Sequence, residues 1–108
     1  MTSTFTSDFI VPANHPSLPG HFPGQPIVPA VVLLDAVLAT IRAHRACVLQ
    51  SIPVAKFLQP VLPDERIELR IQIFAMERAQ SRASFKGFSA DRVVFEGSFI
   101  VSTPGSTP

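Results

Sequence analysis

Polar and apolar residues alternate most regularly in the second half of the chain. The eight residues from Arg66 to Ile73 alternate without a break, which is typical of a strand with one face in the core. Three further segments rich in β-branched or aromatic residues have the length of strands, and two short polar segments between them have the composition of turns. The expected strands are Val54–Leu58, Arg66–Ile73, Ser81–Phe88 and Val93–Val101, and the expected turns are Pro60–Asp64 and Ser89–Arg92.

The first half begins with one expected strand, Phe5–Val11, which Pro12 ends. Six of the 11 prolines then lie between Pro12 and Pro29. Proline fixes its own φ and biases the preceding residue towards extended backbone, so this segment is a stiff loop. Loops of this length in compact domains are usually functional or disordered, and stiffness favours a function.

The segment from Pro29 to about Arg45 predicts the one long helix. Proline suits the first helical position, and alanines and leucines follow it. The first three turns are apolar on every side except at Asp35 and Thr40, which predicts a helix buried all round. We therefore expect an α+β fold in which a curved antiparallel sheet wraps this helix and a second copy covers what remains. The expected domain is 4–103, followed by a frayed tail at 104–108.

Composition narrows the class of protein. Apolar residues make up 46% of the chain, charged residues 16%, and the net charge is +1. These values exclude disorder along the whole chain and nucleic-acid binding driven by bulk charge. Cys47 is the one cysteine, so no internal disulfide exists. The longest apolar run, Ile27–Ile41, is too short to cross a membrane and no leader peptide is evident, so we expect a cytoplasmic protein.

Three ionisable side chains have positions that suggest chemistry. Asp35 is the only ionisable residue between Ile27 and Ile41, and a carboxyl in an apolar wall is either a general acid or a structural acid bound to an amide or an arginine. His15 and His21 lie in the stiff loop, where imidazole acts as an acid or base near neutral pH or simply binds backbone carbonyls. We expect His44 to be a surface residue.

Other site classes find no support in the chain. The CxxC, HExxH, GxGxxG and GxxxxGK[ST] patterns are absent, so there is no motif for structural zinc, for a metalloprotease or for a nucleotide. The remaining acidic residues, including Asp64 and Glu65, lie in expected turns or on polar strand faces, where we expect them to be solvated.

The loop and the start of the helix together are more specific. The segment His15–Ala36 resembles the active-site segment of the 3-hydroxyacyl-acyl-carrier-protein dehydratases, which carry a GHFPG loop that leads into a helix with an acid 14 residues after the histidine. Here the histidine is His21 and the acid is Asp35. The segment Ala55–Asp64 is similar to the strand and turn that follow the helix in that family. The resemblance implies the hotdog fold, in dimers or higher homo-oligomers.

The resemblance also implies roles for individual residues. His21 would take the C2 proton of a 3-hydroxyacyl thioester, Asp35 of the partner subunit would protonate the leaving hydroxyl, and helix N-terminal amides would polarise the carbonyl. The resemblance implies no metal or redox cofactor, and it implies an acyl-carrier protein as the partner. The family has glycine where this chain has Ala30. The implied substrate-binding residues are Phe22, Gly24, Pro29 and Ala30.

The expected reaction is dehydration to a trans-2-enoyl thioester in fatty-acid, polyketide or aryl-polyene pigment synthesis. A non-catalytic acyl-binding subunit of a synthase is an alternative that Ala30 favours, and a hotdog thioesterase is one that His21 argues against. The basic residues Arg78, Arg82 and Lys86 would dock the carrier protein, unless they are ordinary residues of polar strand faces.

Overall fold

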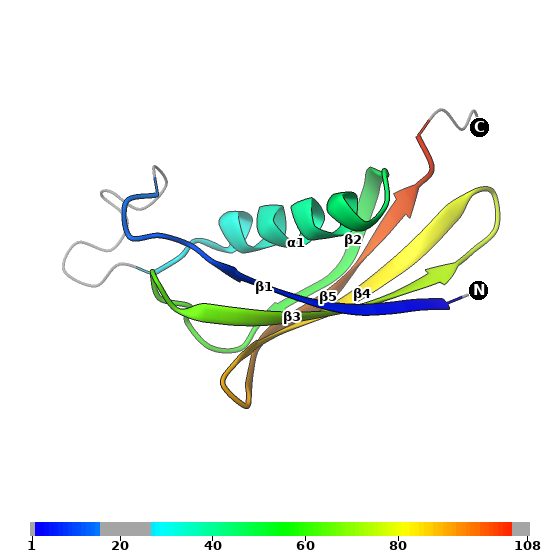
Figure 1. The fold of residues 1–108 in the computed structure, drawn as a ribbon. Helices are drawn as coiled ribbons and strands as arrows, with labels where there is room; N and C mark the ends of the chain where they lie inside the picture. Colours follow the sequence, from blue (N-terminus) through cyan, green and yellow to red (C-terminus); the bar gives the residue numbers. More distant parts are fainter. Residues whose placement is uncertain (1, 16–26, 105–108) are drawn as a thin grey trace.

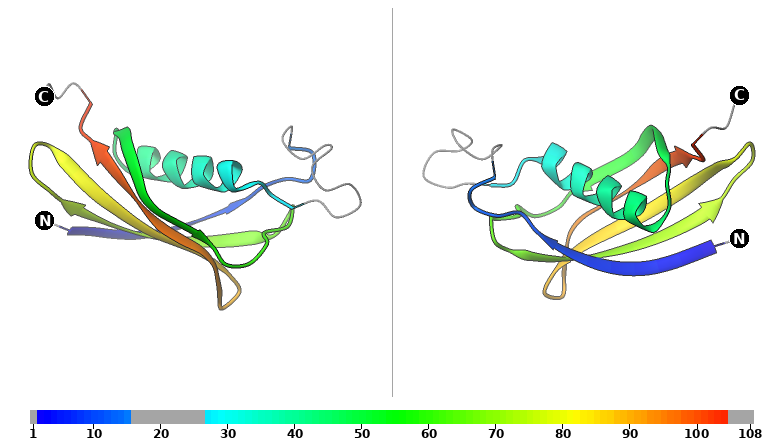
Figure 2. Two further views of the ribbon diagram at one scale, coloured as in Figure 1. Left: turned by 180° about the vertical axis from the view of Figure 1, so that it is seen from behind. Right: turned by 45° about the horizontal axis from the view of Figure 1, so that its top comes forward.

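The computed structural model describes residues 2–15 and 27–104, which form one antiparallel sheet with one helix on it (Figure 1). The sheet has five strands in the order β1-β3-β4-β5-β2, and α1 lies along its concave face (Figure 2). This arrangement confirms the predicted α+β architecture. The elements are β1 (Thr2–Ile10), α1 (Ala30–His44), β2 (Val48–Phe57), β3 (Arg66–Ala75), β4 (Gln80–Ser89) and β5 (Arg92–Ser102).

Each predicted strand is present, but β2 begins at Val48, six residues before its predicted start at Val54. Its register with β5 shifts twice between Leu49 and Val54, which breaks the alternation from which a strand is recognised. Pro53 within the strand is tolerated because β2 lies at the sheet edge, where one row of backbone amides has no partner strand.

Helix α1 starts after Pro29, whose φ of −62° and ψ of 149° are those of an N-cap residue. It buries Val32, Leu33, Val37 and Ile41 against the sheet. The expectation that the helix is buried all round is wrong for a single chain: Val31 is 62% exposed, and Asp35 is also exposed. One sheet covers only one side of a helix, so the described part of the chain leaves the other side of α1 exposed.

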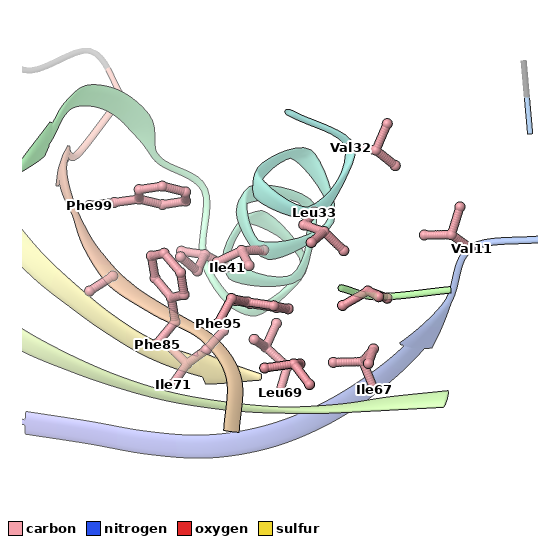
Figure 3. Close-up of a cluster of buried hydrophobic side chains, with 14 of the residues drawn as sticks. Val11, Val32, Leu33, Ile41, Ile67, Leu69, Ile71, Phe85, Phe95 and Phe99 are labelled. Carbon is pink, nitrogen blue, oxygen red and sulfur yellow. The ribbon is translucent and has the colours of Figure 1, made fainter. Parts of the chain in front are cut away.

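The core lies between α1 and the concave face of the sheet (Figure 3). Phe85 packs against both Phe95 and Phe99, with ring centroids 6.1 and 5.0 Å apart. These rings pack beside the aliphatic residues of β3 under the helix. The alternation along β3 buries Ile67, Leu69, Ile71 and Ile73.

In the described part of the chain, no helix is long and apolar enough to span a membrane.

Candidate functional site

Asp35 lies on the second turn of α1 and lines a cavity of about 340 Å³ between the helix and the end of β1. His15, in the segment that follows β1, lines the same cavity. The other lining side chains are apolar and include Phe9, Val11 and Val31, so the carboxylate and the imidazole are its two titratable groups. The structure therefore brings His15, whose role the sequence left open, to the cavity of Asp35.

His21, Phe22 and Gly24 belong to the part of the loop that is outside the described residues. Their approach to Asp35 thus stays a prediction. Their neighbours Pro29 and Ala30 are described: Pro29 is the N-cap of α1, and its carbonyl oxygen accepts hydrogen bonds from the amides of Val32 and Leu33 at 3.0 and 3.3 Å.

Two amides at the start of α1 have no backbone acceptor among the described residues. Ala30 and Val31 donate to no backbone carbonyl in ranges 2–15 and 27–104, as is usual for the first turn of a helix. Ala30 is exposed and lines a second cavity, of about 280 Å³. Helix N-terminal amides carry partial positive charge, so this end of α1 suits an oxygen that develops negative charge.

The second cavity is largely apolar and lies beside the end of β2, an edge strand of the sheet. Its walls include Leu33 from the helix and Phe57 and Leu58 from β2 and the loop after it. Phe57 and Leu58 are 42% and 50% exposed in the single chain. Walls of this kind suit an alkyl or aryl group, and Ala30 is among the lining residues.

A turn between β2 and β3 holds both ends of the proline-rich loop. The amide of Val28 donates to the carbonyl oxygen of Val61 at 2.8 Å, and the amide of Asp64 donates to that of Val11 at 2.8 Å. The Asp64 carboxylate also accepts a hydrogen bond from the amide of Ala13 at 3.2 Å. Asp64 is exposed, as expected of a turn residue, and it also fastens the chain where it enters the loop.

Asp64 holds this position with a φ of 65°, in the left-handed region where aspartate and asparagine are favoured over most other residues. Sequence reasoning missed its role because Ala13, the partner of its carboxylate, is 51 residues away in the chain. The available signal was the Leu-Pro-Asp turn itself, since aspartate after proline commonly binds nearby backbone amides.

Glu65, next in the same turn, has a network of its own. Burial raises the pKa of this carboxyl, but hydrogen bonds from the Ser89 hydroxyl and the Leu62 amide, with the charge of Arg92, outweigh burial and lower the pKa below its ordinary value. The Leu62 amide lies 3.0 Å from the carboxylate. The turn is thereby bound to the end of β4, which stiffens the support of the loop.

The basic residues that would dock a carrier protein do not form one group. Arg78 lies in the β3–β4 turn, at the end of the molecule opposite the N-terminus of α1 (Figure 1). Arg82 and Lys86 lie on the face of β4 that points away from the helix, because Ala83 and Phe85 between them point into the core. Docking of a carrier protein by these three residues stays a prediction.

No cluster of three or more metal-ligating side chains occurs within residues 2–15 and 27–104.

His44, expected at the surface, is exposed and stacks on the ring of Phe5 with centroids 4.0 Å apart. Cys47 is buried, as a small apolar residue would be.

Two curated proteins and one solved structure resemble this chain over most of its length. A 3-hydroxyacyl-[acyl-carrier-protein] dehydratase FabZ of Chloroflexus aggregans is 28% identical over 107 residues, covering 91% of this chain and 74% of that protein. Its counterpart in Chlamydia trachomatis serovar L2 is 32% identical over 104 residues, covering 84% and 68%. The dehydratase heterocomplex ApeI:P of Xenorhabdus doucetiae superposes with a TM-score of 0.73 at 19% identity, over 94% of each chain.

The superposition confirms the hotdog fold predicted from the His15–Ala36 segment. The match to the family extends far beyond that segment, because the sequence model of the ApeI-like family, described as ApeI dehydratase, matches residues 1–98. The matched region includes every element of the fold except the end of β5. The chain therefore belongs to the ApeI-like dehydratase family.

Proposed function

We propose that this protein removes water from a 3-hydroxyacyl thioester carried by an acyl-carrier protein and releases a trans-2-enoyl thioester, in fatty-acid, polyketide or aryl-polyene synthesis. The observation that supports this most directly is the position of Asp35 on the second turn of α1, in a cavity whose other lining side chains, apart from His15, are apolar. The apolar cavity beside Ala30 suits the acyl chain.

The proposed reaction needs a base at C2 and an acid at the 3-hydroxyl. His21 accepts the C2 proton, the electrons of the C2–H bond form the C2–C3 double bond, and the C3–O bond breaks. Asp35 of the partner subunit protonates the departing hydroxyl, which leaves as water. The amide of Ala30 stabilises the negative charge on the thioester oxygen, and Phe22, Gly24 and Pro29 shape the substrate-binding side of the loop.

We also propose that the active unit is a homodimer joined along β2. This edge strand has unpaired backbone groups on one side, and an exposed edge of this kind is normally covered. Its apolar side chains and those of the loop after it are exposed in the single chain, as is Val31 on the outer side of α1. The exposed apolar residues on this edge are Val48, Ile52, Val54, Phe57 and Leu58.

The test is turnover of a 3-hydroxyacyl thioester, followed by the absorbance of the enoyl product and by assay of free thiol. His21→Ala and Asp35→Asn should each reduce dehydration by about 10²-fold or more, the lower range for general acid–base catalysis. Release of thiol without enoyl product would instead identify a thioesterase. Binding of the thioester without turnover would identify the non-catalytic acyl-binding subunit that Ala30 favours.

A mixed dimer tests whether the site is shared. When His21→Ala and Asp35→Asn chains are co-expressed with different tags, a shared site predicts one intact and one doubly substituted site in each mixed dimer. The purified mixed dimer should therefore recover about half of the wild-type rate by this count of sites. An inactive mixed dimer would place both groups within one chain.

A further inference from the structure

A trough crosses the face of the sheet that points away from α1. No described element of the chain covers this face (Figures 1 and 2). The trough has a volume of about 380 Å³ and receives side chains from all five strands. Its floor follows one row of cross-strand neighbours, whose members are small or of medium size: Thr4, Gln72, Ser84, Ser98 and Val54.

Basic side chains form both walls of the trough. Arg82 lies on one side of the floor row, and Arg70, Lys86 and Lys56 form the neighbouring row on the other side. Glu96 is the one acidic residue among the lining side chains. Four cations therefore face one anion, an imbalance well above the net charge of +1 for the chain.

Half of these cations have their charge uncompensated. Arg70 pairs with Glu68 at 2.7 Å and lies over the ring of Phe88, and Lys86 lies 3.9 Å from Glu96. Arg82 and Lys56 form no ion pair with any described residue. The charge available for a ligand is thus placed on opposite walls.

The floor holds a polar atom that lacks a partner. Ser98 is 3% exposed, and its hydroxyl oxygen forms no hydrogen bond with the described residues. The oxygen is itself buried, so Ser98 belongs to the closed floor, and the two basic walls are the feature that indicates a ligand.

The dimensions of the trough identify the shape of that ligand. Arg82 and Lys86 are four residues apart on β4, which separates the walls by about 13 Å at about 3.3 Å per residue. A helix with its side chains is about 10–12 Å wide. The floor crosses five strands, roughly 19 Å, which corresponds to about 13 residues of helix.

We propose that this trough docks an acidic amphipathic helix of a partner protein, lying across the strands with carboxylates against both walls and small residues over the floor. A second copy of this chain does not supply such a helix, because α1 carries one acidic residue, Asp35, and has Arg42 and Arg45 near its end. This docking site is separate from the dehydratase site and does not depend on the proposed reaction.

The probe is a fluorescein-labelled, end-capped 18-residue peptide with glutamates on both flanks of an alanine and serine stripe. Its binding to the full chain is measured by fluorescence anisotropy in 50 and 300 mM NaCl. We expect saturable binding that weakens in the higher salt, because exposed charges are screened. A peptide of the same composition in scrambled order should bind at least fivefold more weakly, and equal binding would overturn the helical geometry.

The variants locate the site on the sheet. Arg82→Glu and Lys56→Glu should each weaken peptide binding about tenfold, whereas Arg78→Glu, the same change in charge outside the trough, should alter it less than twofold. Turnover of a short free thioester should be unchanged in Arg82→Glu. Equal losses in Arg82→Glu and Arg78→Glu, or wild-type self-association that Arg82→Glu abolishes while the peptide fails to bind, would overturn the proposal.

Discussion

The amide nitrogen of Val28 lies 2.8 Å from the carbonyl oxygen of Val61, which binds the chain entering α1 to the turn after β2. Asp64, in the same turn, binds Val11 and Ala13 at the other end of the proline-rich loop. One short turn therefore sets the distance between the two ends of the segment that carries the family motif. The position of that loop depends on residues that have no part in the chemistry.

We predict that Asp64→Ala reduces kcat of the proposed dehydration about tenfold. The substitution removes a hydrogen bond to a carboxylate, worth about 1.5–3 kcal/mol, and places alanine at a positive φ. Asp64→Asn should retain most of the activity, because asparagine tolerates this φ and keeps an acceptor oxygen. Asp91→Ala, in the β4–β5 turn, is the matched control. Equal kinetics for Asp64→Ala and Asp91→Ala would contradict the role of Asp64 as a positioning residue.

His15 and Asp35 share a cavity, and this predicts a measurable effect of His15 on the reaction. His15→Gln should lower kcat/KM by about tenfold, less than the loss expected for His21→Ala, and should change the pH dependence of kcat/KM. The pH profile is the informative measurement, because a purely structural histidine would lower the rate without moving it. An unchanged profile and rate would leave His15 with no role in the site.

Gly87 faces Phe95 across the β4–β5 pair so closely that a Cβ atom would lie 2.4 Å from the ring. Gly87→Ala should therefore destabilise the protein by about 1–3 kcal/mol, the usual cost of overpacking. Urea unfolding measures this loss. The double variant Gly87→Ala with Phe95→Leu should recover part of it, and a Gly87→Ala variant as stable as wild type would show that the ring moves aside freely.

The lowered pKa of Glu65 predicts a pH-dependent contribution to stability. Because the folded-state pKa lies below the unfolded one, the contribution is full above the ordinary value of 4.5 and is lost as pH falls through the folded pKa. Glu65→Gln should therefore unfold more easily than wild type at pH 7, and the difference should shrink below pH 4.5. Denaturant melts at a series of pH values test this. A constant difference down to the acid limit would assign the effect to packing.

The parts of the fold that local pattern controls were predictable. The alternation from Arg66 to Ile73 predicts β3, and Pro29 with the following apolar residues predicts α1 within one residue at each end. The start of β2 was not predictable, because two register shifts interrupt the alternation of polar and apolar residues there. In the site, the helix pattern predicts that Asp35 lies on α1. The hydrogen bond between Asp64 and Ala13 joins residues 51 apart, so no local pattern predicts it.

The strand order has a consequence for how the chain is made. Thr2 pairs with Phe74 and Val48 with Ser102, so each edge strand must wait for a partner that is synthesised long after it. The strands β3, β4 and β5 are joined by short hairpins and can pair as they emerge. We therefore expect strand pairing to begin in this central meander, so β3, β4 and β5 are all synthesised before the apolar side of α1 finds a surface to cover it.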